Sequence, residues 1–324
     1  MVKRVLMLAT GDVMSYSRDP GFPGVATGAE LLETIPDGAL PAEVTVEDVM
    51  TGPSWDMTPS TMLQLARRAR SAILDDGFDG VVITHGTDIL EETAFLVDLM
   101  AGEAASRGGI VLTGAMRCLD ELSSDGPRNL ASAVTAAAHP ALRGVGAVAC
   151  LNDELHAARW VTHVDAVSLS AFSSAPHPVL GHVSGGRVVI EAAPPPRPPH
   201  RAGEPETDVA LIKTYPEIDP VLLTAIVDAG ARGIVLEGTG AGNVPVGLLT
   251  TINELTDWGV PVVVASRCRT ATTPLEELEF GLGLAAKVGA IGARGLAPAK
   301  ARVALMVALG SGGPKAVREW FDRL

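Results

Sequence analysis

Residues 80–88 read Gly-Val-Val-Ile-Thr-His-Gly-Thr-Asp, and this stretch shows the pattern on which the fold is built. Its apolar first half predicts a short buried strand, which small polar residues and a glycine then close. Leu90, Ala94 and Val97 follow at helical spacing and predict a helix directly after the loop. A buried strand, a loop and a helix form the repeating unit of a parallel sheet covered by helices.

The same unit recurs along the first two-thirds of the chain. Thr58 and Pro59 have the residue types of a helix N-cap followed by proline in the first turn. Further strands are predicted at residues 4–10, 43–50, 110–113 and 146–151, and a further helix at 126–138. We therefore expect an α/β fold whose larger N-terminal domain, residues 1–192, has a mostly parallel sheet flanked by helices and carries the active site.

A proline-rich segment, residues 193–207, interrupts this alternation. So many prolines disfavour a helix or a central strand, which predicts an extended linker. Residues 208–324 then predict a smaller C-terminal α/β domain. Its expected strands are 209–215, 233–236 and 261–265, and its last helices are 298–309 and 314–323.

Composition excludes several functional classes. The 324 residues hold 25 Lys and Arg against 38 Asp and Glu, a net charge of -13, which disfavours binding to nucleic acid or to an anionic membrane surface. Mean hydropathy is +0.28, yet no uncharged apolar stretch is long enough to span a membrane. The N-terminus has no cleavable signal pattern, so we expect a cytoplasmic protein.

The three cysteines, Cys118, Cys150 and Cys268, lie far apart and match no zinc-binding spacing. We expect them to be buried free thiols. No metal or cofactor is implied by the sequence.

Small polar residues and glycines follow four of the predicted strands. In an open parallel sheet, ligands bind beyond the carboxyl ends of the strands, where glycine lets the backbone approach a substrate. The four segments are Thr10-Gly11-Asp12, Thr84-His85-Gly86-Thr87-Asp88, Thr113-Gly114-Ala115-Met116-Arg117 and Gly238-Thr239-Gly240-Ala241-Gly242-Asn243.

The order and spacing of these segments resemble the bacterial-type L-asparaginases, which are two-domain amidohydrolases that cleave a side-chain amide through threonine nucleophiles. The resemblance covers nearly the whole chain. It is strongest at Ile83-Thr84-His85-Gly86-Thr87-Asp88 with Glu91-Glu92-Thr93, at Thr113-Gly114-Ala115-Met116-Arg117, and at Ser124-Asp125-Gly126-Pro127 with Asn129-Leu130.

The resemblance implies roles for individual residues. Thr87 stands at the family's second catalytic threonine, and Asp88 at the aspartate that grips the substrate amino group. Ser54 stands where a serine binds the substrate carboxylate, and Ala115 where a backbone carbonyl faces the departing nitrogen. The remaining expected substrate-binding residues are Thr10, Gly11, Asp12, Trp55 and Gly86. The family further implies a small-molecule amide substrate and a homodimer or homotetramer with shared active sites; the departures described next extend the expected substrates to imides.

The chain departs from the family's pattern at two reactive positions. Val13 stands where the family has its first threonine nucleophile, and His163 stands where it has a catalytic lysine. The tyrosine of the family's flexible loop has its nearest counterpart in Phe22, with Tyr16 as the alternative. Ala241 replaces an asparagine that relatives contribute across a subunit contact.

These departures leave alternatives open for the reacting groups. If the loop alignment is shifted, Thr10 or Ser15, rather than Val13, is the counterpart of the family's first nucleophile. A histidine titrates nearer neutral pH than a lysine, so His163 is a candidate general base in a Thr87–His163–Asp88 set.

Three residues of these segments also have ordinary structural explanations. Thr87 has the residue type of a helix cap. Trp55 either reshapes the pocket for a bulkier or cyclic substrate or packs under its loop. His85 is expected to pack behind the loop rather than react.

The sequence thus predicts an asparaginase-like hydrolase of a C–N bond. A substituted amide, a lactam or a cyclic imide is the expected substrate, with backbone N–H groups near Gly11 and Gly86 stabilising the oxyanion. Two alternatives remain. One is an L-asparaginase or glutaminase with a rearranged first loop, and the other is a catalytically inactive ligand-binding homologue.

Overall fold

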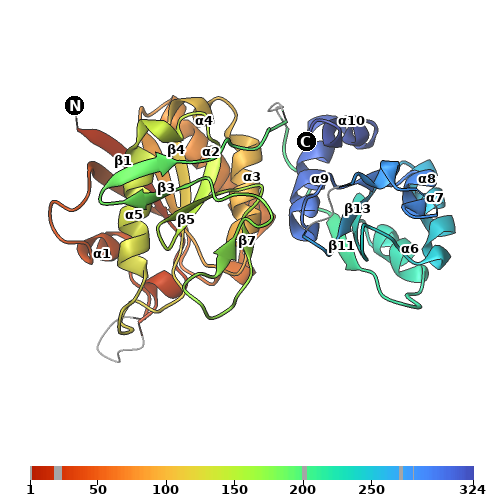
Figure 1. Cartoon of the computed structure of the whole chain (residues 1–324), viewed down its shortest axis with the longest axis horizontal. Helices are drawn as coiled ribbons and strands as arrows, with labels where there is room; N and C mark the ends of the chain where they lie inside the picture. The colour runs from red at the N-terminus through yellow and green to blue at the C-terminus, as the bar shows by residue number, and fades with distance from the viewer. Residues whose placement is uncertain (1, 18–23, 199–202, 270–272, 280) are drawn as a thin grey trace. The chain divides into compact units, whose positions relative to one another are not determined.

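The computed structural model describes residues 2–17, 24–198, 203–269, 273–279 and 281–324. The chain divides into two compact units, residues 1–195 and 196–324, each with its own sheet and core (Figure 1). Each unit is described by itself.

Unit 1 is built on an eight-stranded sheet of order β10-β9-β6-β5-β4-β3-β1-β2. Five neighbouring strands are parallel: β1 (Lys3–Ala9), β2 (Ala42–Asp48), β3 (Gly80–Thr84), β4 (Gly109–Thr113) and β5 (Ala147–Leu151). Three antiparallel strands extend one edge: β6 (Glu154–Ala157), β9 (Gly181–Ser184) and β10 (Arg187–Ile190). A separate hairpin pairs β7 (Thr162–His163) with β8 (Phe172–Ser173).

Helices cover both faces of this sheet. On one face α5 (Gly126–Ala138) and α1 (Gly28–Glu33) enclose a core with inward residues of β1 and β3 such as Val5, Met7 and Val82. Residues alternate across a strand, so Leu6 and Ile83 face the other side, which α2 (Pro59–Leu74) and α3 (Leu90–Ala101) cover. The shorter elements are η1 (Val13–Ser15), η2 (Ser54–Asp56), α4 (Ala104–Arg107) and η3 (Pro140–Leu142).

The periodic segments are found where the sequence predicts them. The helix predicted at residues 126–138 has the bounds of α5, and the Thr58 hydroxyl accepts from the amide of Thr61 as the N-cap of α2. The antiparallel extension of β6, β9 and β10 was not predicted. These strands have four residues each and carry polar residues on one side, so they lack the continuous apolar run that marks a central strand.

The second unit contains a four-stranded parallel sheet of order β11-β12-β13-β14. Its strands are β11 (Val209–Lys213), β12 (Gly233–Gly238), β13 (Val262–Ser266) and β14 (Ile291–Gly292). Its helices are α6 (Val221–Asp228), η4 (Val246–Leu248), α7 (Leu249–Asp257), η5 (Leu275–Glu277), α8 (Leu284–Lys287) and α9 (Pro298–Gly312). The helix predicted at 314–323 is a 3₁₀ turn, η6 (Pro314–Ala316), followed by α10 (Val317–Phe321).

The described residues of the proline-rich segment, 193–198 and 203–207, contain no helix or strand. Its second part does not run free of the fold, because the Glu206 amide donates to the Met306 carbonyl of α9 at 2.9 Å. Gly203 also lies so close to α9 that a Cβ there would come within 2.2 Å of the Gly310 carbonyl oxygen. The segment is therefore partly a packed element of unit 2.

Two of the three cysteines, Cys118 and Cys150, are buried free thiols, as predicted. The prediction is wrong for Cys268, which is exposed because it follows the end of β13 in a surface bend.

Within the described ranges, no helix is both long enough and apolar enough to cross a membrane.

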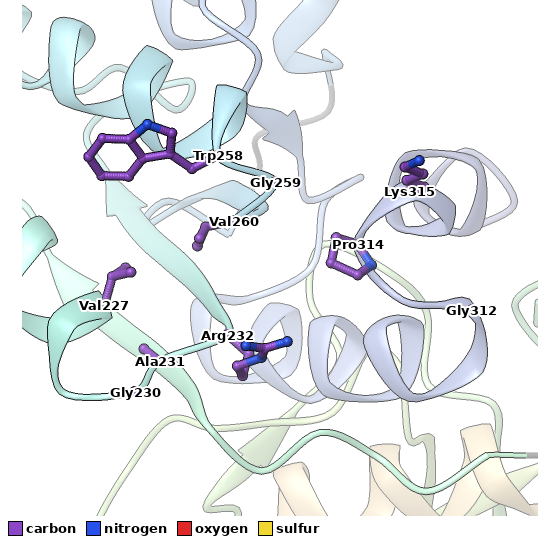
Figure 2. A pocket seen from close by; sticks show the side chains of 10 residues that line it. All are labelled: Val227, Gly230, Ala231, Arg232, Trp258, Gly259, Val260, Gly312, Pro314 and Lys315. Atoms are coloured by element: carbon purple, nitrogen blue, oxygen red, sulfur yellow. The ribbon is translucent and has the colours of Figure 1, made fainter.

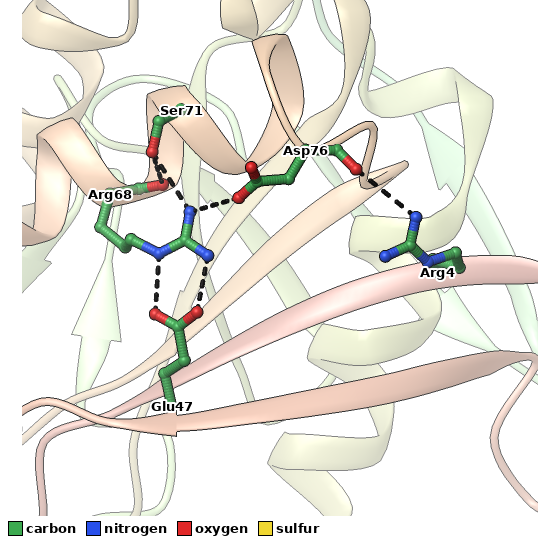
Figure 3. A network of polar contacts seen from close by, with 5 residues as sticks. All are labelled: Arg4, Glu47, Arg68, Ser71 and Asp76. Carbon is green, nitrogen blue, oxygen red and sulfur yellow. Dashed lines mark hydrogen bonds and ion pairs between the residues drawn. The ribbon is translucent and has the colours of Figure 1, made fainter.

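A charged network ties β2 to α2 (Figure 3). The Arg68 guanidinium donates to both carboxylate oxygens of Glu47, at 2.7 and 2.6 Å, and to Asp76 at 2.8 Å. This bidentate pairing with Arg68 lowers the pKa of Glu47 below its usual value. The network therefore fixes the outer parallel strand against its covering helix.

We predict that Arg68→Ala lowers the free energy of unfolding by about 1 kcal/mol at pH 7, because the side chains are partly exposed. The pKa of Glu47 is lowered in the folded state, so its stabilising contribution is present above the unfolded pKa and is lost as pH falls through the folded one. Urea unfolding should therefore show the two proteins converging below about pH 4. Arg107→Ala, which removes an exposed pair with Glu103, is the control with little effect. A difference that persists unchanged at pH 3 would contradict this account.

Candidate active site

The polar segments after β1, β3 and β4 meet at one edge of the sheet. The parallel register aligns Ala9 with Thr84 and Thr84 with Thr113. The Thr10 hydroxyl donates to the Thr84 carbonyl at 2.8 Å, and the His85 amide donates to the Thr113 carbonyl at 2.8 Å. These bonds continue the strand pairing past the strand ends and hold the three segments side by side.

The carboxylate of Asp12 occupies the centre of this edge. Asp12 is 1% exposed, and its carboxylate accepts from the Val13 amide at 2.7 Å and from the Ser54 amide at 2.6 Å. Gly86 lies directly against it, since a Cβ on Gly86 would come within 1.8 Å of Asp12 Oδ2 and 2.3 Å of Ser54 Oγ. Asp12, Ser54 and Gly86, all predicted site residues, are thus brought together.

Thr87 lies between these groups and the loop after β4. It is 7% exposed, and a Cβ on Gly114 would lie 3.5 Å from its methyl group. The helix that follows, α3, has Ile89 at its N-cap and no capping side chain. Helix capping therefore does not occupy the Thr87 hydroxyl. Asp88, the next residue, is exposed.

Asp125 organises the loop that carries Ala115. Its carboxylate accepts from the amides of Met116 and Arg117, each at 3.0 Å, and from the Asn129 side chain at 3.1 Å. Asn129 also donates to the Gly114 carbonyl at 2.9 Å. The motif around Asp125 contributed to the resemblance, but the sequence did not reveal that it positions this loop, because the partners lie on separate segments.

His85 is fully buried behind the loop, as expected. Its Nδ1 donates to the Gly86 carbonyl at 2.7 Å. Burial lowers the pKa of His85, although the Gly86 carbonyl and the Asp12 charge oppose that shift. A neutral imidazole at pH 7 therefore supports the backbone of Gly86.

His163 stands on the β7–β8 hairpin. Its ring stacks on Phe172, with centroids 4.8 Å apart, and its buried Nε2 has no hydrogen-bond partner among the described residues. No hydrogen bond or ion pair within the described ranges joins it to Thr87 or Asp88. The Thr87–His163–Asp88 set therefore stays a prediction.

The remaining residues named from the sequence lie in the loop after β1, in a loop of unit 2, or outside the described residues. Val13 and Ser15 belong to η1, and Ser15 is fully buried. Burial, followed by the charge of Asp12, raises the pKa of Tyr16, so this phenol stays protonated at neutral pH. Phe22 lies outside the described residues, and Ala241 lies in a loop of unit 2.

Trp55 is 62% exposed, so the expectation that it packs under its loop is wrong. It belongs to η2, the short turn that also presents the buried Ser54. The alternative, in which Trp55 shapes the approach to the site, stays a prediction.

A pocket of about 520 Å³ in unit 2 lies at the amino ends of β12 and β13, away from the strand ends where ligands are expected. Arg232, Trp258 and Lys315 line it (Figure 2). Three helices, α6, α7 and α9, end around it, and the cations Arg232 and Lys315 balance the partial negative charge of their carboxyl ends.

Within the described part of the chain, no three His, Cys, Asp or Glu side chains are grouped as a metal site would require.

We predict that Gly86→Ala disrupts the edge, because the added methyl group overlaps the Asp12 carboxylate and the Ser54 hydroxyl. The expected loss is about 1–3 kcal/mol in the free energy of unfolding. Gly247→Ala is the matched control, since nothing lies within 4 Å of the added Cβ. Equal unfolding midpoints for the two variants in urea would contradict the prediction, because they would show that Asp12 and Ser54 leave room for a methyl group at position 86.

The two units match two family descriptions. Residues 4–196 match the model "Asparaginase, N-terminal", and residues 208–321 match "Glutaminase/Asparaginase C-terminal domain". The chain is 33% identical over 320 residues to "L-asparaginase 2" of Escherichia coli (strain K12), which covers 94% of this chain and 88% of that protein. It is 31% identical over 320 residues to the "Glutaminase-asparaginase" of Pseudomonas fluorescens biotype A, covering 94% and 86%.

A solved structure agrees with the whole fold. The crystal structure of a probable cytoplasmic L-asparaginase from Campylobacter jejuni superposes with a TM-score of 0.86 at 30% identity, covering 99% of this chain and 100% of that chain. Together with the two family models and the strand-end motifs, this similarity identifies the chain as a member of the asparaginase family of amidohydrolases.

Proposed function

We propose that this protein hydrolyses the side-chain carboxamide of a small amino acid of the asparagine or glutamine class and releases ammonia. The observation that carries the proposal is the placement of Thr87. It is held at the strand ends between the Asp12–Ser54–Gly86 contact and Gly114, and no helix cap uses its hydroxyl. The names of the relatives, L-asparaginase and glutaminase-asparaginase, support the same substrate class.

In the proposed reaction, His163 accepts a proton from Thr87 as the Thr87 oxygen attacks the amide carbon. The unpartnered, buried Nε2 of His163 supports this role. Backbone N–H groups near Gly11 and Gly86 stabilise the oxyanion. The C–N bond then breaks, the nitrogen leaves as ammonia with the proton from His163, and water releases the acid from Thr87. Asp88 holds the substrate amino group.

A second candidate is the hydrolysis of a substituted amide, a lactam or a cyclic imide. It is favoured by Val13 and His163, which stand where the family has a threonine and a lysine. The relatives named for asparagine favour the first candidate. Ammonia release from asparagine and glutamine, compared with turnover of a panel of lactams and imides, separates the two.

A third candidate is a ligand-binding homologue without activity. It predicts that amides raise the unfolding temperature while no product forms from any of them. Turnover of any amide or imide in the panel would exclude it.

We further propose a cytoplasmic homo-oligomer whose sites are completed by a neighbouring subunit. The similarity to the Campylobacter jejuni protein, which is described as a probable cytoplasmic enzyme, supports the cytoplasmic assignment, whereas a relative from Haemophilus influenzae is named as periplasmic. Light scattering during size-exclusion chromatography measures the oligomeric state. Turnover by a monomer would contradict a shared site.

We predict that Thr87→Ala lowers kcat by about 10³-fold or more, because it removes the attacking oxygen, while Thr87→Ser retains part of the rate. His163→Ala should lower kcat by about 10²–10⁴-fold. His182→Ala is the control, because His182 faces Glu191 on the antiparallel edge of the sheet. Full turnover by both Thr87→Ala and His163→Ala on the true substrate would sink the mechanism.

A further inference from the structure

We propose that the side chain of Asp12 fills a carboxylate-binding cradle beside Thr87 and thereby selects against amides that bring a free carboxylate to this position. The cradle consists of the amides of Val13 and Ser54 and the Ser54 hydroxyl. This inference rests on the proposed function for the place of reaction only. For the substrate class it departs from free asparagine and glutamine and supports the second candidate above, an amide or imide that brings no free carboxylate to this position.

The bound carboxylate itself shows what the cradle recognises. One Asp12 oxygen accepts from the Val13 amide and the other from the Ser54 amide, at 2.7 and 2.6 Å. The Ser54 hydroxyl is buried and has no partner among the described residues, and it lies with Asp12 Oδ2 against the α-carbon of Gly86. Two N–H donors with a free hydroxyl suit a carboxylate, whether it belongs to the protein or to a ligand.

Charge makes Asp12 a competitor for such a ligand. Within the described ranges no lysine or arginine forms an ion pair with it, so the two amide donors carry the stabilisation of this buried carboxylate. A substrate carboxylate entering beside Ser54 has to displace Asp12 or lie next to a like charge, and either costs binding free energy. An amide without that carboxylate avoids the conflict.

The backbone at this position accepts a smaller residue. Asp12 has φ 73°, a left-handed conformation that glycine adopts freely and that a side chain adopts only at a cost. Asp12→Gly therefore removes the carboxylate and also removes the strain of a side chain at positive φ. Asp12→Asn keeps the shape and one acceptor oxygen but removes the charge.

Binding is tested first, independently of turnover. In Asp12→Gly the cradle is vacated and should bind formate or acetate. The unfolding temperature of this variant should therefore rise with sodium formate or sodium acetate concentration until it saturates, relative to sodium chloride of equal ionic strength. Wild type should show no such rise. Neither should Asp219→Ala, in which an exposed aspartate that accepts from the Val221 amide is removed. No rise in Asp12→Gly, or an equal rise in all three proteins, would overturn the proposal.

Kinetics then test selectivity with two substrates that differ only in the carboxylate, L-asparagine and 3-aminopropanamide. We expect Asp12→Gly to raise the ratio of kcat/KM for asparagine over 3-aminopropanamide by about tenfold, mostly through the KM for asparagine, with Asp12→Asn between. If Asp12 only held the loops together, its replacement would change kcat/KM for both amides by the same factor. An unchanged ratio therefore contradicts the inference. If no variant turns over either amide, the proposed function fails, while the formate measurement still decides whether the cradle exists.

Discussion

The strand-end edge of unit 1, where we propose the active site, depends on the close approach of three segments around the Asp12 carboxylate. Asp12 bonds to the amide of Ser54, both side chains press on Gly86, and Gly86 immediately precedes Thr87. A carboxylate buried this deeply is stable only while its donors stay in place. The Asp12 carboxylate therefore joins the loops after β1, β2 and β3, and the hydrogen bond from Thr10 to the Thr84 carbonyl adds a second link beside it. Thr87 directly follows Gly86 in this contact.

The contact around Asp12 adds a third residue to the two positions, Val13 and His163, at which the chain departs from its family. The relatives and both family models establish an amidohydrolase of the asparaginase family. The substitutions at Val13 and His163 first suggest a changed nucleophile and base. The structure draws attention to a third residue, Asp12, whose buried carboxylate bonds to the amides of Val13 and Ser54. Our proposal assigns substrate selectivity to this residue.

Much of the architecture could be predicted from local pattern. The apolar runs that become β3 and β4 are buried on both faces, and the capping residues Thr58 and Pro59 start α2 as expected. The short antiparallel strands could not be predicted, because pairing with a neighbouring strand makes them strands, rather than their own residues. β6 pairs with β5, β9 with β6, and β10 with β9. The exposure of Trp55 and Cys268 likewise depends on how the surrounding turns pack.

The sequence by itself determined the fold class, the family and the candidate residues at the strand ends, because hydrophobic period and motif spacing are local properties of a chain. Only the tertiary structure decided which of those residues touch. It brought Asp12, Ser54 and Gly86 together across 74 positions of sequence, bound Thr10 to Thr84, and placed His163 on a separate hairpin. The physical reason is that parallel strands align their carboxyl ends through register, and register is a property of the sheet rather than of any one segment.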